Sequence, residues 1–106
     1  NRMKFLLVAG IILSMGAPAF AQNIHAVACV QKQMNHLKLN AGQVDGLIGN
    51  QTRAASDAYI AWMKSGPGGP DWAQPRLTSG NAAHWCEKVG EAHPQTAKYW
   101  REYQAM

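Results

Sequence analysis

Two cysteines and two histidines are the residues whose types and spacing allow the most specific chemistry in this sequence. His25 and Cys29 stand one helical turn apart, and His84 lies two positions before Cys86. Two Cys and two His ligands satisfy the count of a structural zinc site. However, the side chains of a His-x-Cys pair point to different faces of a helix, which suits a shared metal ion poorly. A disulfide between Cys29 and Cys86 is the competing interpretation.

The first residues of the sequence indicate export. Arg2 and Lys4 flank the start of an apolar run, FLLVAGIILSM, and the small-x-small motif AFA occupies residues 19–21. This layout is typical of a secretory signal peptide, and the apolar run is too short to span a bilayer comfortably. We therefore predict a signal peptide over residues 1–21 and one domain over residues 22–106. An uncleaved membrane anchor is the alternative.

Export favours the disulfide over the zinc site. Secreted proteins meet an oxidising environment, in which an even number of cysteines usually pairs. A bridge between Cys29 and Cys86 would close a long loop, and the lost chain entropy of the unfolded state gives about 4 kcal/mol of stabilisation. That amount is comparable with the whole stability of a small domain. We expect no metal and no cofactor, and with both thiols in a bridge no cysteine nucleophile is left.

Composition supports neither catalysis nor nucleic-acid binding. The six acidic residues are scattered, and no pair of them can be placed across a cleft as acid and base. Removing Arg2 and Lys4 from the ten Lys and Arg leaves eight against six Asp and Glu, a net charge of +2 without a basic stripe. We predict a protein that is not an enzyme and has no nucleic-acid partner. A small enzyme is the alternative, which two titratable thiols would favour.

Helices must position these residues, because apolar side chains recur at helical spacing and no segment alternates apolar with polar residues. We predict helices over residues 24–37 and 51–64, a third from Ser79 or Asn81 to the His93-Pro94 break, and a last one over residues 95–104. The expected core faces, in chain order, are Val27, Val30, Met34 and Leu37; Ala54, Ala55, Ala58, Tyr59, Trp62 and Met63; Ala82, Trp85, Cys86 and Val89; and Ala97, Trp100 and Tyr103.

The segment KLNAGQVDGLIG, residues 38–49, separates the first two predicted helices and cannot continue either of them. Its turn residues, which tolerate positive φ, are Asn40, Gly42, the Asp45-Gly46 pair and Gly49. Three apolar residues stand between them, and we expect these to pack into the core: Val44, Leu47 and Ile48.

Polar residues gather where this turn meets the second helix. A helix N-terminus presents free N–H groups, which suit a carboxylate ligand, and Arg53 is able to clamp a carboxylate through two hydrogen bonds. Asn50, Thr52 and Asp45 are the further candidates for ligand contacts. The alternative is structural: Asp45 hydrogen-bonds its own turn, Asn50 and Thr52 cap the helix, and Arg53 is solvated.

Trp72 is the remaining candidate. It lies in SGPGGPDWAQPRLT, residues 65–78, whose glycines and prolines exclude regular structure. No helical periodicity demands an aromatic residue there, and binding residues concentrate on loops. Trp72 either stacks on a ligand or fills a gap in the core.

Residues 30–60, VQKQMNHLKLNAGQVDGLIGNQTRAASDAYI, resemble the peptidoglycan-binding-like domain of bacterial cell-wall hydrolases. The shared elements are Val30-Gln31 at a helix start, MNHL at residues 34–37, GQVDG at residues 42–46, GNQTRAA at residues 49–55, and Tyr59. The sequence departs from the family pattern at Lys38, where a helix-ending Gly is common, and at Asn50, where Pro is common.

The resemblance implies a small three-helix core, which we place over residues 24–64. Together with the helical periodicity and the two cysteines it gives the predicted fold, which is all-α with one or two extra C-terminal helices tied to the first helix by the disulfide. It implies non-catalytic binding of peptidoglycan, through its glycan or stem peptide, in the bacterial periplasm or cell wall, without stable membrane insertion after signal cleavage. The ligand contacts would be Asp45, Asn50, Thr52, Arg53 and Trp72. The alternative is a periplasmic protein-interaction or regulatory module on the same scaffold, without wall binding.

Overall fold

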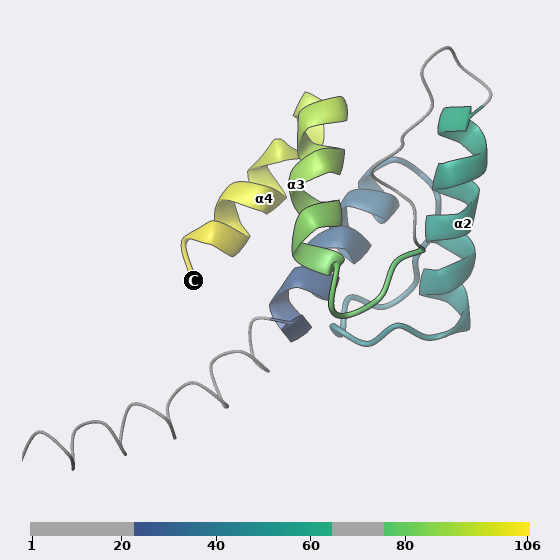
Figure 1. Ribbon diagram of the computed structural model, residues 1–106, viewed down its shortest axis with the longest axis horizontal. Coiled ribbons are helices and arrows are strands. Elements are labelled where there is room, and N and C mark those ends of the chain that lie inside the picture. The colour runs from purple at the N-terminus through teal and green to yellow at the C-terminus, as the bar shows by residue number, and fades with distance from the viewer. Residues whose placement is uncertain (1–22, 65–75) are drawn as a thin grey trace, which may run out of the picture.

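The computed structural model describes residues 23–64 and 76–106, and within these ranges every regular element is a helix. The predicted signal peptide and Trp72 lie outside the described residues. The elements are a first helix over residues 23–36, α2 (Asn50–Lys64), α3 (Ala82–Ala92), the short 3-10 helix η2 (Pro94–Thr96) and α4 (Ala97–Gln104). The predicted all-α fold is confirmed, with α3 standing between α2 and α4 (Figure 1).

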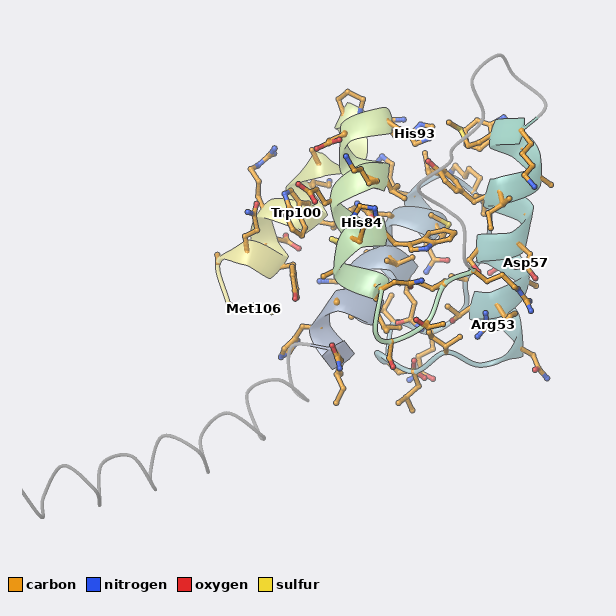
Figure 2. All side chains as sticks on the ribbon, viewed as in Figure 1. Arg53, Asp57, His84, His93, Trp100 and Met106 are labelled. Carbon is orange, nitrogen blue, oxygen red and sulfur yellow. A yellow bond between two sulfur atoms is a disulfide. The ribbon has the colours of Figure 1, made fainter. Side chains whose placement is uncertain are left out.

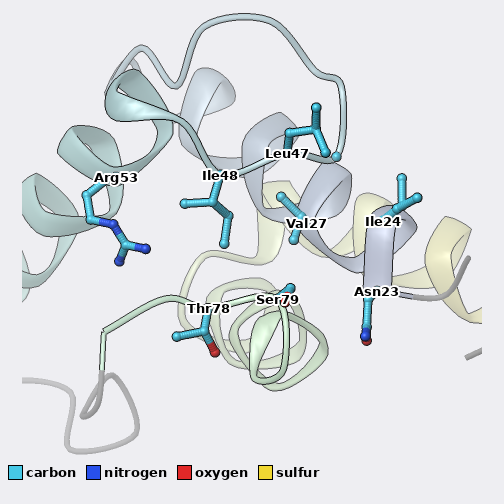
Figure 3. A pocket seen from close by; sticks show the side chains of 9 residues that line it. Asn23, Ile24, Val27, Leu47, Ile48, Arg53, Thr78 and Ser79 are labelled. Carbon is cyan, nitrogen blue, oxygen red and sulfur yellow. The ribbon is translucent and has the colours of Figure 1, made fainter. Parts of the chain in front are cut away.

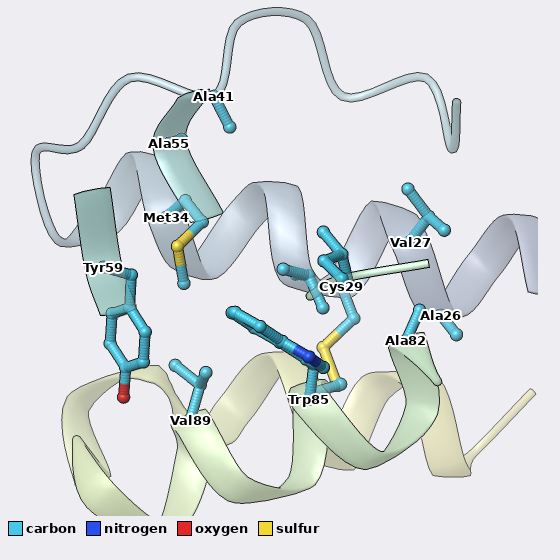
Figure 4. Packing of buried hydrophobic residues seen from close by; sticks show 13 residues of the cluster. Ala26, Val27, Cys29, Met34, Ala41, Ala55, Tyr59, Ala82, Trp85 and Val89 are labelled. Atoms are coloured by element: carbon cyan, nitrogen blue, oxygen red, sulfur yellow. A yellow bond between two sulfur atoms is a disulfide. The ribbon is translucent and has the colours of Figure 1, made fainter. Parts of the chain in front are cut away.

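The core forms where the first helix, α2 and α3 meet. Residues 24–64 contribute two of these helices, and the third is α3 rather than an element inside that stretch. The first helix buries Val27, Val30 and Met34 as its periodicity predicts. The whole predicted face of α3 is buried, namely Ala82, Trp85, Cys86 and Val89 (Figure 4). Burying a large apolar side chain contributes about 1.5–3 kcal/mol, so these faces drive the packing.

The disulfide joins the first helix to α3. Cys29 and Cys86 are bonded, with their Cα atoms 5.9 Å apart, and both side chains are buried. The pairing predicted from export is confirmed. Trp85 lies beside this bond, and Tyr59 reaches the same core from α2, with its ring centroid 6.0 Å from that of Trp85 (Figure 4).

The buried face of α2 differs from the predicted one. The helix buries Thr52, Ala55, Ser56 and Tyr59. Ala54 and Ala58 are exposed, and Trp62 keeps 48% of its surface exposed, so their placement in the core was wrong. Alanine offers little area to bury. The two hydroxyl groups can be buried because they have partners: Thr52 donates to the Ala41 carbonyl at 3.2 Å and Ser56 to the Arg53 carbonyl at 3.0 Å.

The turn between the first helix and α2 uses positive φ at four positions: Lys38, Asn40, Gly42 and Gly46. Gly49 is not among them, so its predicted positive φ was wrong. Gly46 (φ +79°) also needs the absence of a side chain, since a Cβ there would lie 2.7 Å from the Ile24 carbonyl oxygen. At this point the turn therefore packs directly on the start of the first helix.

The apolar residues of the turn do not all pack inward. Leu47 is 65% exposed and Val44 is 41% exposed, so their predicted burial was wrong, whereas Ile48 is half-buried against the core. The backbone of the turn is held by polar contacts rather than by these side chains. The exposed leucine consequently lies on the surface where the turn meets α2.

Candidate functional site

Gln31 on the first helix anchors the turn. Its side chain is fully buried, and its Oε1 accepts hydrogen bonds from the backbone N–H groups of Asp45 (3.0 Å) and Gly46 (2.9 Å). Its Nε2 lies 2.9 Å from the Leu47 carbonyl and 3.0 Å from the Thr52 hydroxyl. One amide therefore connects the first helix, the turn and the start of α2, which fixes where the neighbouring side chains point.

Asp45 has a structural role in this turn. Its Oδ1 accepts the Leu47 backbone N–H at 3.0 Å and the Gln31 amide at 3.1 Å. The hydrogen bond from Leu47, followed by that from Gln31, lowers the pKa of the Asp45 carboxyl below its ordinary value. The carboxyl therefore stays ionised at neutral pH and keeps the turn closed, as the structural interpretation of the Asp-Gly pair expects.

Asp45, Asn50 and Thr52 line one pocket, of about 210 Å³, formed by the turn and the first residues of α2. Thr52 is buried, and its hydroxyl bonds to groups outside α2 rather than capping the helix. Asn50 is exposed at the first position of α2. In this pocket Asn50 is thus the candidate side chain that extends toward solvent.

Arg53 faces a different and larger pocket. Successive residues of a helix point about 100° apart, so Arg53 cannot share the direction of Thr52. Its Nη1 donates to the Leu77 carbonyl at 2.8 Å, which bridges α2 to the segment before α3. The predicted group of polar contacts is therefore divided between two pockets, and Leu47 lines both of them.

The larger pocket has a volume of about 420 Å³ and lies among the start of the first helix, the turn, α2 and the segment before α3. Figure 3 shows Arg53 at one end, Asn23 and Ile24 at the other, and Val27 and Ile48 between them. Leu47, Gly46, Thr78 and Ser79 complete the lining. Such a volume falls within the range of about 300–1,000 Å³ that small-molecule sites occupy.

Sequence reasoning missed most of this pocket. Thr78 and Ser79 lie in a segment whose sequence predicts only a loop and a helix start, and the pattern around Ile24 predicts only the start of a helix. The sequence signal for this pocket is Leu47, an apolar residue directly after the Asp-Gly turn. Its pattern predicts a place in the core, whereas its exposed side chain lines both pockets.

The cysteines and histidines do not form a metal site in the described part of the chain. Both sulfur atoms are consumed in the disulfide, so neither is available as a zinc ligand or a nucleophile. No cluster of three or more His, Cys, Asp or Glu side chains with ligating geometry occurs among residues 23–64 and 76–106. His25 and His84 are both exposed.

An aromatic cluster of Tyr59, Trp62 and His93 lies at the C-terminal end of α2, away from Arg53. The His93 ring stacks on Trp62, with centroids 5.2 Å apart, and its Nε2 lies 3.1 Å from the Tyr59 hydroxyl. Burial lowers the pKa of His93 and raises the pKa of Tyr59 to about 12, so both groups are neutral at pH 7. In Figure 2, His93 is labelled near the top of α3 and Arg53 on the lower part of α2, which separates this cluster from the pockets.

No family model, no curated protein and no solved structure matches this chain. The resemblance to peptidoglycan-binding-like domains accordingly stays a prediction. Among the described helices, none has both the length and the apolar character needed to cross a membrane.

Proposed function

We propose that this protein is exported and binds peptidoglycan without cleaving it. The wall fragment contacts the surface that runs from the turn over residues 45–48 to the start of α2. The observation that supports this best is the pair of pockets on either side of Leu47, one with Asn50 at its edge and one with Arg53. A branched ligand that combines sugar and peptide can fill two adjoining pockets at once.

The resemblance of residues 30–60 to wall-binding domains supports the same surface. Several residues of the shared pattern shape the turn rather than face solvent, among them Gln31, Asp45, Gly46 and Thr52. The pattern thus describes a scaffold that presents Leu47 and Asn50. The Cys29–Cys86 disulfide is compatible with a location outside the reducing cytoplasm.

The test is co-sedimentation of the purified exported protein with purified sacculi. We expect the wild-type protein to be retained, and Leu47→Ser to lose retention, because Leu47 is 65% exposed and its loss removes ligand contact without opening the core. Met106→Ser is the matched control, since Met106 is also exposed (71%) but lies at the C-terminus. Retention no greater than that of an unrelated protein of equal charge, or equal retention of both variants, contradicts the proposal.

A protein partner is the second candidate function, favoured by one specific observation. Leu47 and Val44 expose apolar surface on the same turn, and neighbouring exposed apolar residues are typical of protein-binding surfaces. A photo-crosslinking residue at position 47 in living cells separates the two functions. An adduct bound to sacculi supports wall binding, whereas a discrete protein adduct supports a partner protein.

A further inference from the structure

The charge of Arg53 has no counter-ion within the described residues. The ion pairs there are Lys32–Glu102, Arg76–Asp57 and Lys88–Glu91. Asp57, which follows Arg53 by one helical turn, is occupied by two hydrogen bonds from Arg76, at 3.1 and 2.6 Å. Arg53 is half-buried, and with partners in the described part of the chain its guanidinium makes one hydrogen bond, to a neutral backbone carbonyl. A partly desolvated cation of this kind favours an anionic ligand.

Among the described residues, the rest of the larger pocket has no acidic and no aromatic side chain in its lining. Ile24, Val27, Leu47 and Ile48 give it an apolar wall, and Asn23, Thr78 and Ser79 add polar groups at its edge (Figure 3). Sugar rings bind proteins largely by stacking on aromatic faces, which this lining does not provide. Small aliphatic side chains fit such a wall, and the polar groups at the edge suit a peptide backbone.

We propose that the larger pocket binds the carboxyl-terminal end of a peptidoglycan stem peptide, with its free carboxylate on Arg53 and its small apolar side chains against Leu47 and Ile48. This inference rests on the proposed function and adds which part of the wall is recognised. Arg53 donates to the carboxylate through the remaining N–H groups at the edge of its planar guanidinium, while Nη1 stays bonded to the Leu77 carbonyl. The glycan then extends across Leu47 toward the smaller pocket.

Isothermal titration calorimetry with short probes tests the inference on the purified exported protein. The probes are N-acetyl-D-alanyl-D-alanine, its C-terminal amide, and the all-L dipeptide acid, which represents the C-terminus of a protein. Hydrogen bonds to charged groups are worth enough to change affinity about tenfold or more. We expect the D-configured acid to bind, and the amide to bind at least about tenfold more weakly.

Variants locate the binding. Arg53→Gln should weaken binding of the acid by about tenfold or more and leave no preference for the acid over the amide. Arg53→Lys keeps the charge but loses the planar fork, so it should bind with intermediate affinity. Arg101→Gln makes the same change of charge on the exposed face of α4 and should bind as the wild type does. Ser79→Trp fills the pocket from its exposed edge and should abolish binding, which provides a test even if Arg53→Gln fails to fold.

Four results overturn the inference: equal binding of acid and amide, unchanged binding by Arg53→Gln and Ser79→Trp, preference for the all-L acid, or no binding of any dipeptide. The sacculus assay separates this failure from failure of the proposed function. Retention on sacculi without dipeptide binding rejects the carboxylate site alone. Failure of the wild-type protein to be retained on sacculi rejects wall binding itself.

Discussion

Replacing Gln31 with leucine removes the contact on which the geometry of both pockets depends. The Gln31 side chain is fully buried and accepts the backbone N–H groups of Asp45 and Gly46, while its amide donates toward Leu47 and Thr52. Leucine fills similar space but offers neither an acceptor nor a donor. The turn then keeps its sequence and loses its attachment to the first helix.

The loss of stability in Gln31→Leu can be estimated from the polar groups that it leaves without hydrogen-bond partners. The Gly46 N–H is buried, and an unsatisfied buried donor costs about 1–3 kcal/mol, with about 1 kcal/mol for each further lost bond. With the Asp45 N–H, the Leu47 carbonyl and the Thr52 hydroxyl as the further lost partners, the expected loss for Gln31→Leu is about 4–6 kcal/mol in the free energy of unfolding. For a domain of this size, each kcal/mol lowers the melting temperature by about 4–8 °C, so a decrease of more than about 10 °C is expected.

Gln33 provides the matched control two residues further along the same helix. It is equally buried, and its Nε2 donates to the Cys86 carbonyl at 2.9 Å, but its Oε1 has no hydrogen-bond partner among the described residues. Gln33→Leu loses this bond and a longer one to the Thr96 carbonyl (3.5 Å), and it also removes the unpartnered oxygen, so the free energy of unfolding should fall by only about 1–2 kcal/mol. Urea denaturation followed by far-ultraviolet circular dichroism measures the free energy of unfolding of both variants. Equal losses for the two variants would refute the anchoring role of Gln31.

Three further predictions concern the turn, the aromatic cluster and the disulfide. Gly46→Ala should destabilise the fold by more than about 1 kcal/mol, because φ is +79° and a Cβ would meet the Ile24 carbonyl; thermal unfolding measures this. Burial lowers the pKa of His93, so the unfolded chain binds a proton more readily and stability should fall as the pH drops through about 6.5; melting temperatures from pH 8 to 5 test this. Replacing Cys29 and Cys86 by alanine should cost about 4 kcal/mol, measured by urea denaturation.

Each of these predictions has a result that contradicts it. Gly49→Ala is the control for the turn, because Gly49 has an ordinary φ and no atom within 4 Å of an added Cβ. Equal effects at Gly46 and Gly49 would remove the steric explanation. A His93→Gln variant with the same pH dependence as the wild type would assign that dependence to other groups. A fully stable double alanine variant would show that packing alone holds the first helix on α3.

The helices that could be predicted are those whose apolar residues follow one clear period. Val27, Val30 and Met34 define the buried side of the first helix, and Trp85 and Val89 that of α3. The disulfide was predictable as well, because the sequence has two cysteines and its first residues predict export to an oxidising compartment. In these elements local pattern and tertiary packing agree.

The buried face of α2 could not be read from hydrophobicity. Its apolar side chains spread over a wide arc around the helix axis, and the alanines among them gain little from burial, so they do not determine which side of α2 faces the core. What fixes the direction is the burial of Thr52, whose hydroxyl group reaches the Ala41 carbonyl only once the turn has folded, whereas the buried Ser56 bonds to the Arg53 carbonyl within α2. This long-range condition also turns Trp62 outward, where it stacks on His93.

Three of the candidate residues can be grouped from the sequence, but the division of the site into two pockets cannot. Asp45, Asn50 and Thr52 do meet in one pocket, because the turn returns the chain to the start of α2. Arg53 is separated from them by one helical step and joins Leu47 in the larger pocket. The sequence could not reveal this pocket, since its walls come from segments brought together by the whole fold.

Wall binding at the turn and α2 is tested by a nuclear magnetic resonance titration of the isotope-labelled protein with a soluble muropeptide. We expect the backbone signals of residues 46–48, 53 and 78–79 to shift together and saturate, while those around His93 stay unchanged. Shifts confined to the His93 and Trp62 region, or no saturable shift at any position, would contradict wall binding at the turn and α2.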